Sequence, residues 1–495
     1  MIDKVSIRRL ATGVPGLDAV LGGGLPEYSF NLITGPPGAG KTTLAFQLMF
    51  AMATREKPAL FFTVLGEPPL KMLRYQQQFS FFDLARVNDT IRFVNLSDEV
   101  ATGKLERVLA RIAEEVEAFS PALVFVDSLR SVKLDGPPVD GAISLQQFIQ
   151  ELGMLLSSWQ ATTFLIGEYL SESNPHPVFT VADGLLALDQ AVHRNSMVRK
   201  IQVLKMRGQA TSPGMHTFRI TNAGLEVFPA AVVRGDTPAP RAPAPVPSER
   251  RLTMGVPRLD EMLGGGLPAG YSLLVAGPSG SGKTILATAF LSEGARLGEP
   301  GVLVAFEQTP SLSRNRTIDD LVQAGKLGVI NTRSLDLSID EIVQQLLTMI
   351  RKMKATRVVI DSLSGFELAV APTFREDFRE SLFRMVTALT ALGVTVLMTS
   401  ELEDRYTDLR FSPYGSAFLT DAIIVQRYIE VASCLKRVMA VVKVRASDHS
   451  SEIRQFEIDD SGLVIGDVVL DYDGLLGGRP TRNARDVAAG GGLAR

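Results

Sequence analysis

Two stretches of the chain combine closely spaced glycines with a lysine and a threonine. Residues Gly35–Thr42 read GPPGAGKT and residues Gly277–Thr284 read GPSGSGKT, so both fit the pattern G-x-x-x-x-G-K-[ST]. Each stretch follows an apolar run typical of a buried strand and precedes a run typical of a helix. Glycines let backbone amides turn inward around phosphate oxygens, and a helix N-terminus adds positive potential. The two stretches are therefore predicted to be phosphate loops.

The loops predict a site for ATP and Mg²⁺ in each half of the chain. Lys41 and Lys283 are expected to reach the β- and γ-phosphates and to act in catalysis, while Thr42 and Thr284 are expected to ligate Mg²⁺. The other residues expected to contact the nucleotide are Gly35, Pro36, Pro37, Gly38, Ala39, Gly40, Thr43, Gly277, Pro278, Ser279, Gly280, Ser281, Gly282 and Ile285.

An acidic residue at the end of a buried strand is expected to complete each magnesium site. The run LVFVD ends in Asp127 and the run RVVID ends in Asp361, and Ser-Leu follows both. A single aspartate after a strand is usually a cap or a turn residue. Because the aspartate recurs at the same point in both copies, Asp127 and Asp361 are predicted to be Mg²⁺ ligands.

Hydrolysis also needs a group that orients the attacking water. In the second copy, VLVAFEQTP places Glu307 at the end of a strand, where its carboxylate can act as a general base. The first copy reads FFTVLGEPP, and alignment on Pro68 and Pro310 puts Glu67 two places later than Glu307. A shift of two residues keeps the same face of a strand, so Glu67 is the second candidate base; a solvated loop glutamate is the alternative.

Polar residues also end the fourth apolar run of each copy. These are Glu168 in FLIGE and Thr399, Ser400 and Glu401 in LMTSE. Such positions can sense the γ-phosphate, although ordinary polarity at a strand end explains them equally well.

A Lys-x-Arg tripeptide occurs late in each copy, as Lys205-Met206-Arg207 and Lys443-Val444-Arg445. Taken alone, each would be a surface charge pair. Recurrence at equivalent points favours a second interpretation, in which the basic residues act as an arginine finger on a phosphate in a neighbouring subunit.

The loops belong to a long internal repeat. RLATGVPGLDAVLGGGLP at 9–26 aligns with RLTMGVPRLDEMLGGGLP at 251–268, which is the signature of a duplicated domain. The shared LGGGLP precedes the phosphate loop by the length of a strand, so it is interpreted as the turn that leads into the first core strand. The predicted divisions are an N-terminal ATPase domain at 1–233, a Pro/Ala-rich linker at 234–250, a C-terminal ATPase domain at 251–467 and a mobile tail at 468–495.

Within each copy, short apolar runs alternate with amphipathic stretches. FNLITG, ALFFTVL, ALVFVD and TTFLIG are predicted strands of the first copy, and SLLVAG, GVLVAF, RVVID and VTVLMTS are those of the second. Strands that are apolar on both faces and separated by helices predict an α/β fold with a mainly parallel sheet covered on both sides. The ends of the copies, at 200–228 and 439–466, read as antiparallel hairpins along one edge.

Composition limits the setting in which the protein works. The 495 residues are 45% hydrophobic, carry a net charge of −3 and contain one cysteine, Cys434, and four scattered histidines. We therefore expect a cytoplasmic protein without internal disulfides or a histidine metal site. The charge balance argues against a nucleic-acid partner, and the lack of a long apolar run argues against a membrane.

These residues together resemble the KaiC-type ATPases, a branch of the RecA-like P-loop superfamily. The stretch TGVPGLDAVLGGGLP…GPPGAGKTT, the strand-end aspartates and the Lys-x-Arg hairpins carry the resemblance, which covers about residues 6–466. The resemblance implies two tandem RecA-like domains per subunit, homo-hexameric rings of two tiers, and ATP between neighbouring subunits. It also implies that Lys205, Arg207, Lys443 and Arg445 act on the nucleotide of the adjacent subunit, and that an acidic pair after the second strand holds the base, of which only Glu307 is in register.

The resemblance suggests a kinase function, but the residues of this chain argue against it. The circadian member of the family autophosphorylates adjacent Ser and Thr residues just before a Thr-Asp. Here Thr420–Asp421 is present, but the matching pair is Ala417–Phe418, which has no hydroxyl to accept phosphate. Ser412, Ser416 and Thr420 lie nearby, and nothing marks them as acceptors.

The sequence thus favours a ring protein that binds and hydrolyses ATP and uses turnover as a conformational signal, with an unidentified protein partner. Three alternatives remain. The protein could be an autokinase or Ser/Thr protein kinase, or a nucleotide-controlled assembly scaffold with a weakly active first domain. A DNA-dependent motor is the weakest alternative, because the net charge is negative and no added DNA-binding domain is apparent.

Overall fold

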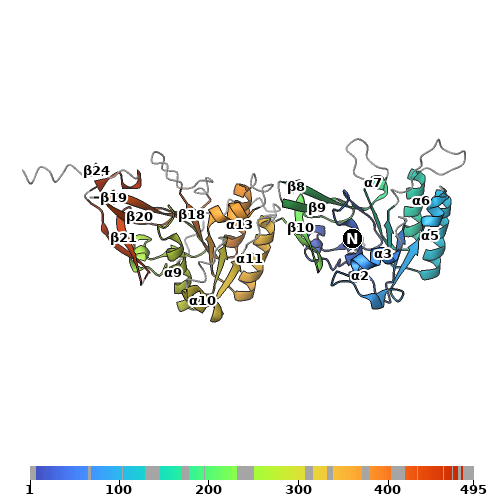
Figure 1. Ribbon diagram of the computed structural model, residues 1–495, viewed down its shortest axis with the longest axis horizontal. Coiled ribbons are helices and arrows are strands. Elements are labelled where there is room, and N and C mark those ends of the chain that lie inside the picture. The colour runs from blue at the N-terminus through green and yellow to red at the C-terminus, as the bar shows by residue number, and fades with distance from the viewer. Residues whose placement is uncertain are drawn as a thin grey trace, which may run out of the picture. The chain divides into compact units, whose positions relative to one another are not determined.

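The computed structural model divides the chain into two compact units, unit 1 at Met1–Ala230 and unit 2 at Ala231–Arg495 (Figure 1). The structure describes residues 7–64, 69–102, 104–128, 145–168, 178–193, 196–230, 250–306, 316–331, 338–370, 378–402, 419–431, 433–460, 462–470, 472–477 and 481–482. Within these ranges, no helix has both the length and the apolar character needed to cross a bilayer.

Unit 1 alternates strands and helices before it ends in four consecutive strands. Its described elements are β1 (Arg9–Leu10), α1 (Leu17–Leu21), β2 (Leu25–Pro26), β3 (Phe30–Thr34), α2 (Lys41–Met52), β4 (Ala59–Thr63), α3 (Pro69–Gln76), a 3-10 turn (Leu84–Arg86), β5 (Ile91–Asn95), α4 (Ser97–Ala101), α5 (Leu105–Phe119), β6 (Leu123–Asp127), α6 (Leu145–Ser158), β7 (Thr162–Gly167), α7 (Val178–Val181), β8 (Gly184–His193), β9 (Ser196–Met206), β10 (Met215–Thr221) and β11 (Gly224–Phe228).

Unit 2 has the same order of strands, differs from unit 1 in its short helices, and adds short elements at its end. Its described elements are β12 (Arg251–Leu252), α8 (Pro257–Met262), β13 (Leu267–Pro268), β14 (Ser272–Gly277), α9 (Lys283–Arg296), β15 (Gly301–Ala305), α10 (Arg316–Gln323), β16 (Leu327–Asn331), α11 (Ile339–Met353), β17 (Arg357–Asp361), α12 (Leu363–Ala369), α13 (Phe378–Ala391), β18 (Thr395–Glu401), β19 (Ala422–Val431), β20 (Cys434–Val444), β21 (Ile453–Asp459), β22 (Gly462–Val468), β23 (Tyr472–Asp473), a 3-10 turn (Leu475–Gly477) and β24 (Thr481–Arg482).

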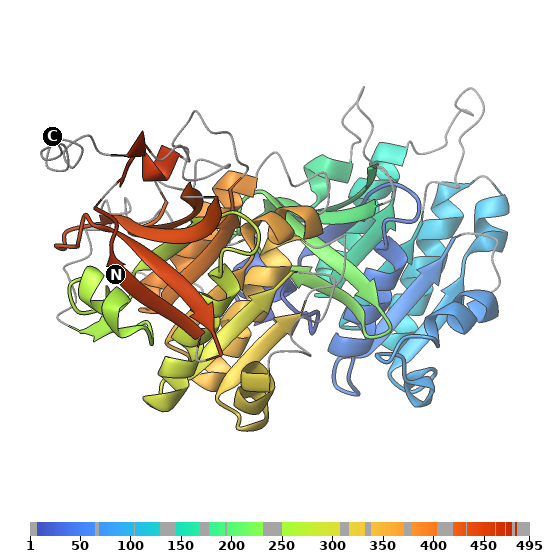
Figure 2. The ribbon, with the colours of Figure 1, turned by 60° about the vertical axis from the view of Figure 1, so that its left-hand side comes forward.

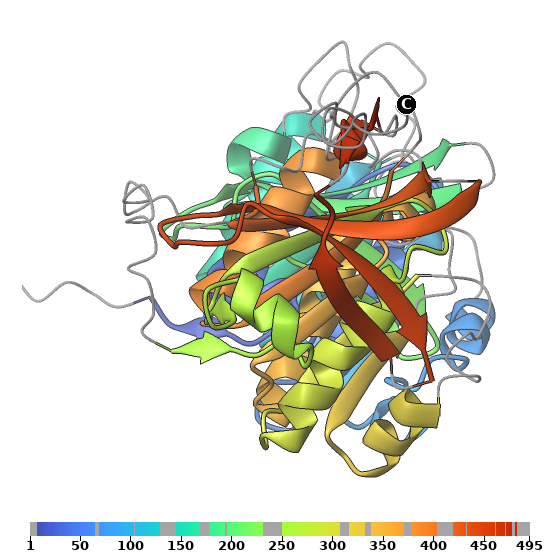
Figure 3. The same cartoon turned by 90° about the vertical axis from the view of Figure 1, so that its left-hand side faces the viewer.

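Each unit is built on a nine-stranded sheet of the same topology. The strand order is β11-β10-β9-β8-β3-β7-β6-β4-β5 in unit 1 and β16-β15-β17-β18-β14-β19-β20-β21-β22 in unit 2. Strands β8 to β5 pair in parallel, whereas β8 to β11 pair antiparallel, and unit 2 does the same. The red antiparallel strands of unit 2 twist strongly relative to one another in Figure 3. The predicted α/β fold, with mainly parallel sheets and an antiparallel edge, is confirmed.

Helices cover both faces of each sheet and enclose two cores per unit. In unit 1, α2 buries Leu44 and Phe46 against one face, and α5 and α6 bury Ile112 and Phe148 against the other. In unit 2, α9 covers one face and the layer of α11, α12 and α13 covers the other. The helices of that layer, coloured yellow to orange, lie against the sheet in Figure 2. Parallel strands buried on both faces read as unbroken apolar runs, which is why they were visible in the sequence.

The helices form where the sequence gives one apolar stripe and a defined start. In α11, Ile342, Leu346 and Ile350 recur at the spacing of one helical face and are buried. The Ser338 side chain caps the helix by accepting a hydrogen bond from the Glu341 backbone N–H at 3.1 Å. The cap and the buried stripe together fix both the start of the helix and the face that it turns to the sheet.

Several features of the fold were not predicted from the sequence, among them strands β8 and β19. The edge strands β5 and β16 were missed, because IRFVN in β5 mixes buried and exposed positions and lacks a continuous apolar run. Part of the segment expected to be a mobile tail has regular structure. Its residues Val469 and Tyr472 pack against a small core of Ile429, Val438 and Leu475.

The repeated LGGGLP forms a tight turn between the first helix and a short strand. Gly22, Gly23 and Gly24 have φ of 77°, 118° and 114°, and residues 264–266 have φ of 72°, 100° and 109°. A Cβ on Gly24 would lie 2.4 Å from the Leu10 carbonyl oxygen, because β2 pairs with β1 at this point. Glycine is thus required both by the positive φ and by the close backbone contact.

We predict that Gly24→Ala strongly destabilises unit 1. The substitution combines an unfavourable φ with a backbone clash, so it should lower the free energy of unfolding by about 3 kcal/mol or more. Gly214→Ala is the matched control, because Gly214 also has a positive φ, of 90°, but a Cβ there would meet nothing within 4 Å; we expect a loss of about 1 kcal/mol. Urea unfolding can be followed by the fluorescence of Trp159, the single tryptophan of the chain, which lies in unit 1. Equal losses would contradict the role assigned to the clash.

Candidate functional site

The two phosphate loops have similar φ angles at their second and third glycines. In unit 1 the loop leaves the end of β3 and enters α2, and Gly38 and Gly40 have φ of 76° and 98°. In unit 2, Gly280 and Gly282 have φ of 74° and 103°. Gly40 and Gly282 are the N-cap residues of α2 and α9, so the loop amides and the helix N-terminus face the same region.

The loop lysine is held over its own loop in both units. Lys41 Nζ donates hydrogen bonds to the carbonyl oxygens of Gly35 and Pro36, each at 2.8 Å. Lys283 Nζ makes the same bonds to Gly277 and Pro278, at 2.9 and 2.7 Å. The ammonium group is therefore positioned at the start of the loop, where it can interact with phosphate oxygens.

The strand-end aspartate is close to the loop threonine in unit 1. Thr42 Oγ1 donates a hydrogen bond of 2.8 Å to Asp127 Oδ2. Burial raises the pKa of the Asp127 carboxyl, while the hydrogen bond from Thr42 and the nearby charge of Lys41 act in the opposite direction. The predicted metal ligands Thr42 and Asp127 are thus brought together, at the end of β6.

The equivalent aspartate of unit 2 has a different partner. Asp361 Oδ1 accepts a short hydrogen bond from Thr399 Oγ1 in the neighbouring strand β18. In unit 1 the strand register places Ile166, which has no hydroxyl, at the position of Thr399. The next residue, Ser362, caps α12 by accepting a hydrogen bond from Gly365 N at 3.1 Å. Asp361 is therefore held toward β18, and its predicted co-ligand Thr284 is exposed at the start of α9.

The donor atoms at both loops suit magnesium. Carboxylate and hydroxyl oxygens are hard ligands, which Mg²⁺ prefers, and Mg²⁺ is usually held by one or two protein groups together with phosphates and water. No group of three or more His, Cys, Asp or Glu residues able to hold a metal ion occurs in the described ranges. The donors present at the loops fit a magnesium ion that is also bound by the phosphates of a nucleotide.

Other candidate residues surround the loops. Glu168 Oε1 lies 3.9 Å from Lys41 Nζ. Glu401 stands opposite Gly277 in the strand register, and the buried hydroxyl of Ser400 has no hydrogen-bond partner within the described residues. The candidate bases Glu67 and Glu307 lie outside the described residues. The strands that precede them, β4 and β15, run beside the strands that end in Asp127 and Asp361.

The structure places the Lys-x-Arg residues at the opposite end of the sheet from the loop of their own unit. Arg207 Nη1 is 3.0 Å from Asp183 Oδ1, and Asp183 Oδ2 accepts a hydrogen bond from the backbone N–H of Phe30, the first residue of β3. The phosphate loop begins after the last residue of β3, so about 16 Å of strand separates the two groups. Lys205 Nζ donates to the carbonyl oxygen of Phe179 at this same end.

Unit 2 repeats this arrangement around Asp421. Arg445 Nη1 lies 3.3 Å from Asp421 Oδ1, and Asp421 Oδ2 accepts from the backbone N–H of Ser272, the first residue of β14, at 3.0 Å. Lys443 Nζ donates to the Thr420 carbonyl oxygen at 2.7 Å. Burial and the neighbouring Arg445 lower the pKa of Lys443, and Asp421 partly opposes them.

Two residues that contact the loops were not predicted from the sequence. Gln190 Nε2 donates to the Pro37 carbonyl oxygen at 2.9 Å, and Gln426 Oε1 accepts from Ser281 Oγ at 3.0 Å. Both come from the strand beside the phosphate strand, β8 or β19. Alignment of the two copies could have drawn attention to these positions, because their residues differ between two units of the same topology.

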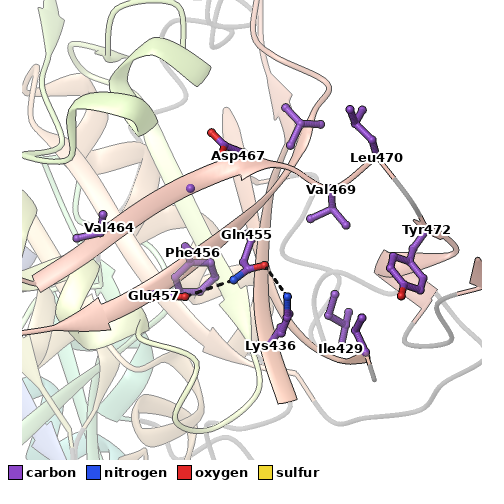
Figure 4. A pocket seen from close by; sticks show the side chains of 13 residues that line it. Ile429, Lys436, Gln455, Phe456, Glu457, Val464, Asp467, Val469, Leu470 and Tyr472 are labelled. Carbon is purple, nitrogen blue, oxygen red and sulfur yellow. Dashed lines mark hydrogen bonds between the residues drawn. The ribbon is translucent and has the colours of Figure 1, made fainter. Parts of the chain in front are cut away.

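A separate cavity of about 490 Å³ lies on the antiparallel strands of unit 2 and the segment that follows them. Ile429, Val469 and Tyr472 give it an apolar side, and Figure 4 shows Gln455 between Lys436 and Glu457 on the polar side. The Gln455 side chain bonds to both neighbours at 3.4 Å. None of the predicted nucleotide residues lines this cavity.

Comparison with known proteins agrees with this geometry. The family model for the KaiC ATPase matches the chain twice, over residues 10–232 and 252–468. The chain belongs to the KaiC family. Each matched range of this chain contains one phosphate loop, one strand-end aspartate and one Lys-x-Arg tripeptide. The predicted resemblance and the two RecA-like domains are confirmed.

Similar KaiC proteins extend over nearly the whole chain. The circadian clock oscillator protein KaiC of a Picosynechococcus species is 28% identical, with 97% of this chain and 94% of the relative covered. The circadian clock oscillator protein KaiC 1 of a Synechocystis species is 27% identical, with 98% and 94% covered. The circadian clock protein KaiC3 of the same species is 28% identical, with 98% and 97% covered.

We predict that Thr42→Val destabilises nucleotide-free unit 1 by about 1–3 kcal/mol, because it leaves the buried Asp127 carboxylate without its donor. In the wild type this hydrogen bond stabilises the charged form of the Asp127 carboxyl. The destabilisation caused by its loss should therefore be largest at neutral pH and shrink as the pH falls through the pKa of Asp127. Scanning calorimetry at several pH values measures both effects. Thr284→Val is the matched control, since Asp361 takes its hydrogen bond from Thr399; a comparable loss in that variant would contradict the assignment.

Proposed function

We propose that the chain binds MgATP at both phosphate loops, hydrolyses it, and uses turnover as a conformational signal within a homo-hexameric ring. The observation that carries the proposal is the coincidence, in each unit, of a glycine-capped helix, a loop lysine and a strand-end aspartate at one end of the parallel sheet. Membership of the KaiC ATPase family supports the same activity.

Each part of the site has a physical role in this proposal. Loop amides and the helix N-terminus bind the phosphates, and Lys41 or Lys283 offsets their negative charge. Thr42 with Asp127, and Thr284 with Asp361, hold Mg²⁺, which neutralises charge on the transferred phosphoryl group. Glu307, and in unit 1 Glu67, is the proposed base that orients water. The lysines and threonines begin α2 and α9, and the aspartates end the parallel strands β6 and β17. The two glutamates come after β4 and β15 in the sequence.

The Lys-x-Arg residues require a neighbouring subunit in this proposal. About 16 Å of strand separates them from the loop of their own unit, so they cannot reach a phosphate bound there. Arg207 and Arg445 are 60% and 45% exposed and can therefore meet another surface. A head-to-tail arrangement of subunits brings one subunit's arginine to the next subunit's loop, and such an arrangement closes into a ring.

We expect unit 2 to be the stronger ATPase. Lys283→Ala should lower phosphate release from MgATP by about tenfold or more, whereas Lys41→Ala should lower it less, because only unit 2 has an acidic residue in register after its second strand. Lys326→Ala, at an exposed turn, is the control for loss of a lysine charge and should behave as the wild type. Equal losses from the two loop variants would contradict the assignment of unit 2 as the more active site.

The same assay distinguishes hydrolysis from protein phosphorylation. With ATP labelled on the γ-phosphate, an ATPase releases the label as free phosphate, whereas an autokinase transfers part of it to the chain. We expect free phosphate alone. Stable label on the protein, located by mass spectrometry, would favour the kinase alternative instead.

We further predict that two defective subunits complement each other. Lys283→Ala removes the loop cation and Arg445→Ala removes the proposed finger, so each variant alone should be weakly active in unit 2. In co-expressed mixed assemblies, some interfaces pair an intact loop with an intact arginine, and part of the activity should return. Pairing Lys283→Ala with the double variant Lys283→Ala/Arg445→Ala is the control, because no intact loop is present. Failure of the first pair to recover activity would overturn the action of Arg445 across the interface.

A further inference from the structure

The two phosphate loops rest on different chemistry. In unit 2, Ser281 Oγ donates a hydrogen bond of 3.0 Å to Gln426 Oε1 in β19, and these side chains are 1% and 0% exposed. In unit 1, Ala39 and Leu188 are both fully buried in one apolar core. One loop is therefore supported by a buried polar pair and the other by an apolar pair.

These four residues occupy equivalent places in the two units. Ala39 and Ser281 are each the fifth residue of the loop. In unit 1, Thr34 pairs with Ala187, the residue before Leu188. In unit 2, the equivalent Ala276 pairs with Val425, the residue before Gln426. The difference between the pairs is thus a paired substitution at matching sites, with both members changed together.

The strand residue lies beside the first residue of the loop in both units, and in unit 2 it also bonds to the fifth. A Cβ built on Gly277, the first loop residue, would lie 2.7 Å from Ser281 Oγ and 3.0 Å from Gln426 Cβ. In unit 1, a Cβ on Gly35 would lie 3.3 Å from Leu188 Cβ. Leu188 and Gln426 therefore lie beneath their loops and fix the spacing between the first glycine and the fifth residue. We call this strand residue together with the fifth loop residue the floor of the loop.

Burial makes the polar floor depend on both of its members. A buried hydroxyl or amide that loses its partner is destabilised far more than one that loses a partner at the surface. Gln426 Nε2 already has no hydrogen-bond partner in the described part of the chain, so Ser281 is an important partner of this amide. The mixed pairs, Ser with Leu or Ala with Gln, would also leave the Ser281 hydroxyl or Gln426 Oε1 without the bond that joins them, whereas the matched pairs would not.

The loop tips are also held differently. Gln190 donates to the Pro37 carbonyl oxygen at the tip of loop 1, while Tyr428 takes the equivalent place in β19 and its hydroxyl lies 3.1 Å from a Cβ built on Gly280. The loop of unit 1 (loop 1) is thus fixed at its tip by the hydrogen bond from Gln190, and the loop of unit 2 (loop 2) is fixed from beneath by the bond between Ser281 and Gln426.

We propose that Gln426 is a positioning residue of the second nucleotide site. Through Ser281 it holds the loop amides of unit 2 in the conformation that binds the phosphates of ATP. This inference rests on the proposed function, because it assumes that loop 2 binds a nucleotide. Leu188 supports loop 1 by packing alone.

A double-mutant cycle tests the proposal in the full-length chain carrying Lys41→Ala, so that binding reports mainly on site 2. Gln426→Leu should raise the dissociation constant for a fluorescent ATP analogue with Mg²⁺ by about tenfold, because the Ser281 hydroxyl loses its partner. Ser281→Ala should weaken binding in the same direction. The double variant Ser281→Ala/Gln426→Leu recreates the pair found in unit 1 and should recover most of the lost affinity.

Thr395→Val is the control for general loss of a buried hydrogen bond. Thr395 is fully buried, and its hydroxyl accepts from Gly270 N at 2.8 Å at the start of β18, which is the end of the strand away from the loop. This variant should lower the melting temperature of unit 2 without changing nucleotide affinity. Gln426→Met, with a similar length and no hydrogen-bonding amide, should match Gln426→Leu if packing is not the cause.

The outcomes separate this inference from the proposed function. Additive losses in the double variant would overturn action through Ser281, and so would unchanged affinity with a lowered melting temperature. If the parent protein binds the analogue, such results refute only the role of Gln426. If the parent protein does not bind it, and full-length protein without Lys41→Ala does not bind it either, the proposed function fails.

Discussion

One carboxylate in each unit joins the start of the phosphate strand to the Lys-x-Arg hairpin. Asp183 and Asp421 accept a hydrogen bond from the first backbone amide of β3 or β14 and pair with Arg207 or Arg445. The phosphate strand then runs straight from this carboxylate to its loop. Strand direction therefore determines where the charged groups lie. The parallel strands place the phosphate loop and the strand-end aspartate at one end of the sheet. Because β9 and β20 run antiparallel to their neighbours β8 and β19, the basic residues lie at the opposite end of the sheet.

This layout is common to the units, and the local contacts within it differ. Asp127 bonds to the loop threonine in unit 1, whereas Asp361 bonds to Thr399 in unit 2. This difference arises where Ile166 stands in unit 1 at the place that Thr399 takes in unit 2, on strands of equivalent position in the sheet. A duplicated sheet can thus keep its topology while each copy adjusts the groups that surround its loop.

The sequence predicted what depends on short-range pattern and on burial. The phosphate loops, the buried parallel strands and the aspartates at their ends were all visible, because a fully buried strand must be apolar and a tight loop must contain glycine. Side-chain contacts between distant segments were not visible. The pairing of Gln426 with Ser281 spans 145 residues, and the pairing of Asp421 with Arg445 depends on how β19 and β20 fold back on one another. The edge strand β5 was missed because an edge strand need not be apolar on both faces.

The three glycines of LGGGLP have a consequence for how the two copies diverged after duplication. Their positive φ and the backbone contact of Gly24 with Leu10 exclude larger side chains, whatever chemistry the unit performs. A substitution there would disturb the backbone, whereas Ala39 with Leu188 and Ser281 with Gln426 show that the equivalent positions beside the loops accept either an apolar or a polar pair. The identical LGGGLP segments therefore reflect a backbone conformation that the two units share. The residues that differ between the units, such as the pairs beside the loops, are those that make the two sites different.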